Sequence, residues 1–219
     1  MKTVVALFSK TDTIVAPWLD AGYRAVIVDL QHPEGEIADG NLVRIGADLL
    51  DWVPPRWLAR SDVSFAAAFP PCDHMAVSGA RWFAGKGLGK LAQSIRLFER
   101  AAFWCEWFGA PYLIENPVST ISSYWRKPDH AFNPCDYTAF ELADNYTKKT
   151  CLWTGHGFAM PPSRMAPHLP PPDDRIHKAA PSPDRADFRS ATPLGFAKAV
   201  FAANANARVT APQPATISE

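Results

Sequence analysis

Short apolar runs alternate with a helical pattern along the first part of the chain. The runs Thr3–Phe8, Arg24–Asp29 and Leu42–Ile45 consist mainly of valine, isoleucine, leucine and alanine, and each predicts a short buried strand. Between the first two, Thr13–Ala21 has the pattern of a helix and precedes Gly22, a residue that commonly ends helices. A strand, a helix and a second strand within about thirty residues predict a βαβ unit, and hence a parallel sheet.

The same alternation continues beyond residue 60. A fourth apolar run covers Val63–Phe69, a fifth covers Tyr112–Ile114 and a sixth covers Lys149–Trp153. Between the fourth and fifth runs, residues 88–108 carry apolar side chains at spacings of three and four, which predicts a long amphipathic helix that ends at Gly109. Together these elements predict an α/β fold with a mostly parallel, Rossmann-like sheet and helices on both faces.

Three stretches lack a periodic apolar pattern. Residues 33–40 are polar and contain glycine, which predicts a loop. Residues 157–190 form a proline-rich insertion in which we expect no regular structure, because proline fixes φ and removes a backbone donor. A last helix is predicted from Thr192 to about Asn204, and the small, polar residues 205–219 are expected to be a disordered tail.

Length and composition narrow the class of protein. A chain of 219 residues, 47% of them hydrophobic, fits one α/β domain, which we place at residues 1–204. The formal net charge of zero excludes a uniformly basic coat for nucleic acid and leaves room for a local basic face. Four cysteines without a C-x-x-C pair indicate reduced thiols. Because no signal peptide precedes the first strand and no apolar stretch reaches the about 20 residues of a membrane helix, we expect a cytoplasmic protein outside the membrane.

Two polar residues stand where predicted strands end. Cys72 closes the segment Phe69-Pro-Pro-Cys72 after the fourth strand, and Glu115 follows the fifth strand in Glu115-Asn-Pro117. The carboxyl ends of parallel strands face one crevice in which ligands bind, so we expect the thiol and the carboxyl group to converge there. Such a pair suits covalent chemistry on a ring that must also be protonated. Taken singly, each residue also has an ordinary interpretation, as a structural cysteine and as a cap or surface charge.

The order and character of these segments resemble the DNA cytosine-5 methyltransferases. That family pairs a Pro-Cys nucleophile loop with a downstream Glu-Asn-Val or Glu-Asn-Pro acid, as in the two segments above. The resemblance implies a methyltransferase type of sheet and S-adenosylmethionine as the methyl donor. It implies that the Cys72 thiolate attacks C6 of cytosine, that Glu115 binds N3, and that C5 receives the methyl group. The expected partner is DNA, from which the target base is flipped out.

The resemblance also implies contacts on both sides of this pair. The residues expected to bind the cofactor are Phe8, Ser9, Thr11, Asp29, Asp48 and Pro70, with Asp29 at the ribose and Asp48 near the adenine. The residues expected to bind the substrate are Pro71, Ser78, Arg81, Asn116, Lys148 and Lys149. Residues 81–90 resemble the mobile loop that closes on DNA, and the segment that begins at Ala191 resembles the one that packs beside the first strand.

Three features depart from the family pattern. The glycine-rich turn after the first strand is replaced by Ser9–Thr13, and an arginine-bearing segment is replaced by Tyr146–Lys149. The large target-recognition region is missing, so reading of a long DNA site is not expected. A free cytosine nucleotide, short single-stranded DNA or a target brought by a protein partner remain alternative substrates. A different one-carbon donor, or a catalytically silent relative that binds DNA or protein, also remains open. The compact size resembles proteins carried by phages or mobile elements.

Two further signals concern metals and aromatic residues. The six histidines show no ligand spacing, and His74 beside Cys72 has no partners at zinc-like spacing, so we expect no metal site. Trp82 and Phe83 follow the Cys72 segment, where they either stack on a base or pack in the core.

Overall fold

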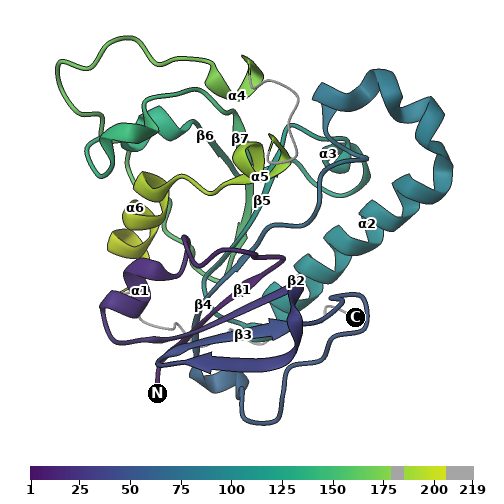
Figure 1. Ribbon diagram of the computed structural model, residues 1–219, viewed down its shortest axis with the longest axis vertical. Coiled ribbons are helices and arrows are strands. Elements are labelled where there is room, and N and C mark those ends of the chain that lie inside the picture. The colour runs from purple at the N-terminus through teal and green to yellow at the C-terminus, as the bar shows by residue number, and fades with distance from the viewer. Residues whose placement is uncertain (179–184, 206–219) are drawn as a thin grey trace, which may run out of the picture.

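The computed structural model describes residues 1–178 and 185–205, which form an α/β fold around a seven-stranded sheet (Figure 1). The strands are β1 Thr3–Leu7, β2 Arg24–Asp39, β3 Leu42–Gly46, β4 Val63–Ala68, β5 Tyr112–Pro117, β6 His130–Phe132 and β7 Thr150–Gly155. Their order in the sheet is β3-β2-β1-β4-β5-β7-β6. β1 pairs in parallel with β2 and β4, and β4 with β5, whereas β7 runs antiparallel to β5 and β6. The sheet is therefore mostly parallel and mixed.

The centre of the sheet contains the apolar strands that the sequence predicts. All five residues of β1 are buried, because this strand is covered on both faces. β1 lies between β2 and β4. After β1 the chain builds β2 and β3 on one side of it, and it then crosses to the other side of β1 to form β4 and β5. This reversal creates the crevice at which α/β proteins bind ligands.

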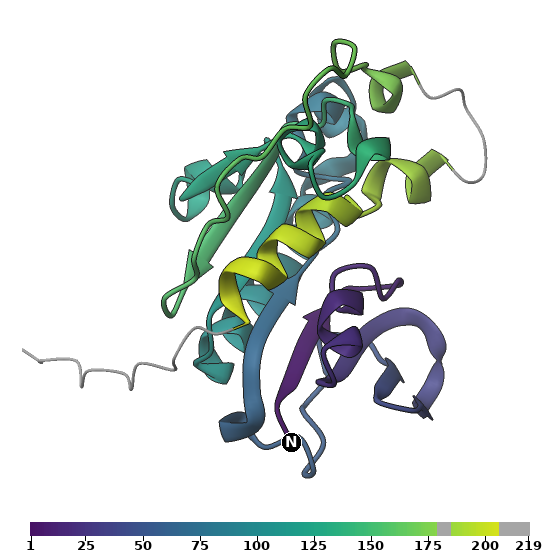
Figure 2. The same ribbon diagram turned by 90° about the vertical axis from the view of Figure 1, so that its left-hand side faces the viewer.

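Helices cover both faces, as expected. One face packs against α2 (Phe83–Phe108), and the other against α1 (Ala16–Asp20) and α6 (Leu194–Asn204) (Figures 1 and 2). On the second face the fully buried ring of Trp18 in α1 stacks on Phe65 of β4, with ring centroids 5.0 Å apart. Such aromatic burial fixes the short helix on the sheet, since five residues alone would not form a stable helix.

The prediction of a loop at residues 33–40 is wrong. β2 continues to Asp39, and its second half pairs with β3 in the opposite direction, with Glu36 opposite Ile45 and Asp39 opposite Leu42. Gly40, with φ of 57°, makes the tight turn of this hairpin. The side chains of residues 33–39 are exposed, so the strand carries no apolar pattern from which it could be predicted.

The remaining elements are short. They are α3 Ile121–Tyr124, α4 Arg175–Lys178, α5 Arg185–Ser190 and the 3₁₀ helices η1 Arg60–Asp62, η2 Val77–Trp82, η3 Pro134–Tyr137 and η4 Leu142–Asp144. The proline-rich insertion is irregular up to residue 174 apart from an isolated bridge at Asp173, but α4 and α5 fall within it and correct the expectation there. The last helix is confirmed by α6, while residues 206–219 of the expected tail lie outside the described residues.

The long helix begins earlier than the apolar spacing indicates. α2 starts at Phe83 and bends at Gly87, whose φ of 77° and ψ of 168° are not helical, and Gly109 ends it in the left-handed conformation with φ of 66°. The part after the bend matches the predicted helix over residues 88–108. Among the described residues, no helix combines the length and the apolar character that crossing a bilayer requires.

Candidate active site at the carboxyl ends of the strands

Cys72 stands in a tight turn directly after β4. Its carbonyl oxygen accepts hydrogen bonds from the backbone N–H groups of Met75, at 3.0 Å, and Ala76, at 2.9 Å. The approach to the turn is fixed at its start, where Phe69 N–H donates to the carbonyl of Leu7 at the end of β1 over 3.0 Å. Cys72 is partly exposed, whereas the three other cysteines are buried. A thiol at this place is accessible and held on a rigid turn.

Hydrogen bonds join this turn to the segment that follows β5. The N–H of Thr120 donates to the carbonyl of Met75 over 3.0 Å, and that of Val77 donates to the carbonyl of Val118 over 2.9 Å. The fully buried Asn116 adds a side-chain bond, because its Nδ2 donates to the carbonyl of Pro70 over 2.9 Å. Asn116 is therefore brought to the site, where it fixes the two segments to one another.

Glu115 and Lys148 share the electrostatic surroundings of Cys72. Burial raises the pKa of the Cys72 thiol to about 11, and the negative charges of Glu115 and Asp73 act in the same direction, against Lys148. Burial also raises the pKa of Glu115, and again the charge of Lys148 opposes the shift. Because the charges of Glu115 and Lys148 both act on the Cys72 thiol, the three groups lie near one another at this end of the sheet.

Lys148 is held in place by the chain that returns to the sheet. Its Nζ donates to the carbonyl oxygen of Ala191, between α5 and α6, over 3.1 Å. Lys149 is exposed, and its charge acts on the thiol of Cys151 in β7, the strand that begins at the next residue. Of the two lysines that were expected to bind substrate, the structure brings only Lys148 to the Cys72 and Glu115 pair.

The other residues expected to bind substrate are Pro71, Ser78 and Arg81. Pro71 is exposed next to Cys72, whereas Pro70, which was expected to bind the cofactor, is buried in the same segment. Ser78 and Arg81 are exposed in η2, and the guanidinium of Arg81 lies over the ring of Trp82, 5.0 Å from its centroid. These two residues therefore form part of a neighbouring surface rather than of the thiol site itself.

The residues expected to bind a cofactor line the other side of the crevice. Phe8 follows β1 with φ of 55°, a left-handed conformation that is rare without glycine, so the chain turns sharply here in the absence of the glycine-rich segment. The backbone N–H of Ser9 donates to the carbonyl of Val28 over 3.1 Å, and the Ser9 hydroxyl donates to the carbonyl of Thr11 over 2.9 Å. Thr11 is exposed beside this turn.

Two carboxylates follow along the chain, Asp29 where the parallel pairing of β2 with β3 ends and Asp48 after β3. Asp29 is 9% exposed, and its Oδ1 accepts the N–H of Gln31 over 2.8 Å. Asp48 is exposed after β3, and its Oδ1 accepts the N–H of Leu50 over 2.9 Å. A carboxylate accepts up to about four hydrogen bonds, so both groups retain capacity for the hydroxyl groups of a ligand.

Several polar atoms near Cys72 are buried without a hydrogen-bond partner. Six such side-chain atoms occur among the described residues, and four belong to the two joined segments: His74 Nδ1, Asn116 Oδ1, Ser119 Oγ and Thr120 Oγ1. Buried polar atoms are nearly always paired, so this concentration indicates a place where a ligand or water supplies partners. Sequence reasoning missed Ser119 and Thr120, and its only available signal was their position directly after Glu115-Asn-Pro117.

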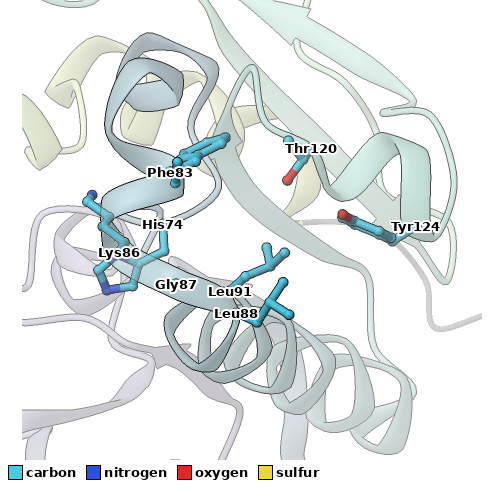
Figure 3. Close-up of a pocket in the computed structure, with 9 residues that line it drawn as sticks. His74, Phe83, Lys86, Gly87, Leu88, Leu91, Thr120 and Tyr124 are labelled. Carbon is cyan, nitrogen blue, oxygen red and sulfur yellow. The ribbon is translucent and has the colours of Figure 1, made fainter.

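A pocket of about 410 Å³ opens beside the Cys72 turn (Figure 3). Its wall contains His74 from the turn, Lys86 and Leu91 from α2, and Thr120 and Tyr124 from the segment around α3. A second pocket, of about 620 Å³, follows the apolar side of α2 from Ile95 to Trp107. Neither wall includes Cys72 or Glu115, so the first pocket lies beside the turn that carries Cys72 without containing the chemical pair.

The fold and the site define an α/β protein with a mostly parallel, mixed seven-stranded sheet and with Cys72, Glu115 and Lys148 near one another at the ends of its strands. Within the parts of the chain that the structure describes, no group of three or more histidine, cysteine, aspartate or glutamate residues is arranged to hold a metal ion. No model of a known protein family matches the chain, and no curated protein matches it at a significant level.

Proposed function

We propose that the protein transfers a methyl group from S-adenosylmethionine to C5 of a cytosine, with DNA as the substrate and Cys72 as the nucleophile. The observation that carries this proposal is the shared site of Cys72, Glu115 and Lys148. The thiol is delivered by the turn after β4 and the carboxyl group by β5, and hydrogen bonds hold the two segments together.

The chemistry begins with a ring that reacts poorly at C5. Addition of the Cys72 sulfur to C6 forms an S–C6 bond and moves the electron pair of the C5=C6 bond to C5, which then becomes nucleophilic. Glu115 neutralises the charge that develops at N3 by holding a proton there. Transfer of the methyl group to C5 would release S-adenosylhomocysteine. Loss of the C5 proton to a water molecule and departure of the Cys72 thiolate then restore the C5=C6 bond.

The raised pKa values fit this division of roles. A carboxyl group whose pKa is raised by burial takes up a proton more readily than usual, and it can share that proton with N3. Once Glu115 is neutral, one cause of the high pKa of Cys72 is removed, and Lys148 then favours the thiolate. The thiol proton passes to solvent, to which the partly exposed Cys72 has access.

The other side of the crevice fits S-adenosylmethionine. Asp29 would hold the ribose hydroxyls and Asp48 would lie near the adenine, while the turn at Phe8 to Thr11 replaces the usual glycine-rich segment. When bound, this group supplies an electrophilic methyl group. A mostly parallel sheet with one reversed strand near its edge also agrees with the methyltransferase type of sheet that the resemblance implies.

The adduct can be tested with an oligonucleotide that contains 5-fluorocytosine. Fluorine at C5 cannot leave as a proton does, so the bond between Cys72 and C6 should persist after methyl transfer. We expect a covalent complex on a denaturing gel that requires S-adenosylmethionine, with the modified peptide containing residue 72. The Cys72→Ala variant should form none, while the Cys135→Ala variant, which changes a buried cysteine, should form it normally.

A complex that forms equally well with Cys72→Ala would remove Cys72 from the mechanism. Binding of DNA without any adduct or methyl transfer by the wild type would instead favour the catalytically silent relative. Comparison of duplex DNA, short single strands and free dCMP as methyl acceptors then separates the alternative substrates.

A further inference from the structure

The pocket beside the Cys72 turn has the size and shape of a site for a planar ligand. Its volume of about 410 Å³ lies within the range of about 300–1,000 Å³ that is typical of small-molecule sites. The pocket is formed where α2 bends at Gly87, because the bend separates the first turn of the helix from the straight part that starts at Leu88. The protein therefore maintains this cavity by a specific backbone conformation.

The wall combines aromatic and aliphatic surfaces. Phe83 and Tyr124 contribute rings from α2 and α3, and Leu88 and Leu91 contribute aliphatic side chains (Figure 3). Stacking on such surfaces is how proteins bind nucleobases without a strict sequence preference. Leu88 is 82% exposed and Tyr124 is 59% exposed, so the apolar surface is open to an incoming ligand.

Two unpaired polar atoms belong to residues of the same wall. Nδ1 of His74 and Oγ1 of Thr120 are buried and have no hydrogen-bond partner among the described residues. Figure 3 shows the oxygen atoms of Thr120 and Tyr124 on one side of the pocket, with His74 and Lys86 on the other. Both unpaired atoms are covered in this structure, so a rotation of the side chain has to turn them toward the pocket before a ligand can pair with them. A ligand with donors and acceptors at its edge then removes the free-energy cost of the unpaired groups. A nucleobase has this combination of apolar faces and polar edges.

One turn of the chain carries both the thiol of Cys72 and a residue of the pocket wall. His74 lies two residues after Cys72 in the same turn, and Lys86 Nζ donates to the carbonyl of Asp73, the residue between them. A cation is thus held against the backbone of the turn that carries both Cys72 and His74. The phosphodiester that links two neighbouring nucleotides would pass at this point, and lysine is a common phosphate ligand.

We infer that this pocket binds the nucleobase next to the target cytosine, so that the substrate is a polynucleotide and not a free nucleotide. This inference rests on the proposed function, because it uses Cys72 to place the target base. A mononucleotide has no second base, and it leaves the pocket and its two unpaired polar atoms without a partner.

The test uses isothermal titration of the full-length protein with the trinucleotide d(TCT), with the same molecule carrying an abasic site at its first or third position, and with dCMP. We expect d(TCT) to bind at least about tenfold more tightly than dCMP, since stacking of one base contributes about this factor. Loss of one of the two flanking bases should remove most of the advantage, which identifies the base that occupies the pocket. Equal affinity of d(TCT) and dCMP would overturn the inference.

Two variants and one control locate the effect. Tyr124→Ala should reduce the affinity for d(TCT) about tenfold and leave that for dCMP unchanged. Thr120→Val removes the unpaired hydroxyl at nearly constant shape, so it should weaken d(TCT) binding without lowering the melting temperature. Phe103→Ala changes an exposed aromatic residue of α2 that lines only the second pocket, and it should have no effect.

Failure of the inference and failure of the proposed function remain distinguishable. Normal methyl transfer to DNA with no effect of Tyr124→Ala on d(TCT) binding rejects the pocket and keeps the function. Tyr124-dependent binding of d(TCT) without methyl transfer keeps the pocket and rejects the function.

Discussion

The two sides of the crevice treat their polar groups differently. On the side of β1 to β3, Ser9, Asp29 and Asp48 each form a hydrogen bond with the backbone two residues further on. On the side of β4 and β5, His74, Asn116, Ser119 and Thr120 each bury a polar atom without a partner. On the first side each of these groups has a partner within its own turn, and the two carboxylates keep spare acceptor capacity at the surface. On the second side the polar atoms are buried and have no partner at all. The two sides therefore differ in how they can bind: the first can add hydrogen bonds to those it already has, and the second has buried atoms that still lack their first partner.

The largest expected effect comes from Glu115→Gln. This change removes the proton that we assign to N3, and methyl transfer should fall at least about a hundredfold, a typical contribution of acid catalysis. The same change removes a charge that raises the pKa of Cys72, so alkylation of Cys72 by iodoacetamide should become faster at pH 8. Mass spectrometry measures both the rate of methyl transfer and the rate of Cys72 alkylation. A variant in which both rates fall would indicate that the substitution has disrupted the turn that carries Cys72.

The pH dependence of Cys72 in the wild type tests the same site without mutation. Because the pKa is raised to about 11, the thiolate fraction is small at neutral pH and should increase about tenfold for each pH unit up to that value. Alkylation of residue 72 should therefore rise about a hundredfold between pH 7 and pH 9. A rate that levels off below pH 9 would contradict the raised pKa. Quantified peptides with the other, buried cysteines provide the internal control.

Asp29→Asn tests the side of β1 to β3. The amide keeps the oxygen that accepts the Gln31 N–H but loses the charge that strengthens hydrogen bonds from hydroxyl groups, so affinity for S-adenosylmethionine should fall about tenfold. Calorimetry measures this affinity. Alkylation of Cys72 should stay at the wild-type rate, and a change in it would show that the two sides are coupled.

The smallest effects come from a matched pair of serines, one on each side. Ser9→Ala removes a hydrogen bond of 2.9 Å from a residue that is 7% exposed, and it should lower the free energy of unfolding by about 1 kcal/mol. Ser119→Ala removes a hydroxyl that is buried without a partner in a residue that is 5% exposed, and it should leave that free energy unchanged or raise it by up to about 1 kcal/mol. Urea unfolding measures both. An equal decrease of the free energy of unfolding in the two variants would contradict the proposed difference between the two sides.

Hydrophobic patterning predicts the parts of the fold that are covered on both faces. β1, the first half of β2, β4, β5 and the straight part of α2 are identified because their apolar residues are buried. The second half of β2 is exposed and forms only through backbone pairing, and β6 has three residues, so neither leaves a periodic pattern. The antiparallel direction of β7 also has no signal in its own residues, since a strand looks the same in either direction.

The candidate site shows a similar limit. Cys72 and Glu115 were found from their positions at the ends of predicted strands, and in the structure the charge of Glu115 acts on the Cys72 thiol. The sequence does not distinguish Lys148 from Lys149, because their difference depends on which of two neighbouring side chains reaches the carbonyl of Ala191. The unpaired atoms of Ser119 and Thr120 depend on contacts between segments about forty residues apart in the chain, and no local pattern reports such contacts.

The anchor of Lys148 has a consequence for how this chain can diverge. Lys148 donates to a main-chain oxygen, so the side chain at residue 191 can change without loss of this hydrogen bond. The path of the backbone at residue 191 has to be retained. The segment from Gly157 to Ser190 is also tied to the rest of the protein by backbone hydrogen bonds of Arg164 and Asp173, so insertions and deletions are tolerated between these ties as long as the chain comes back to the same position. We expect homologues to vary in the length of this excursion and to conserve its point of return, together with the ammonium group that it steadies beside the thiol.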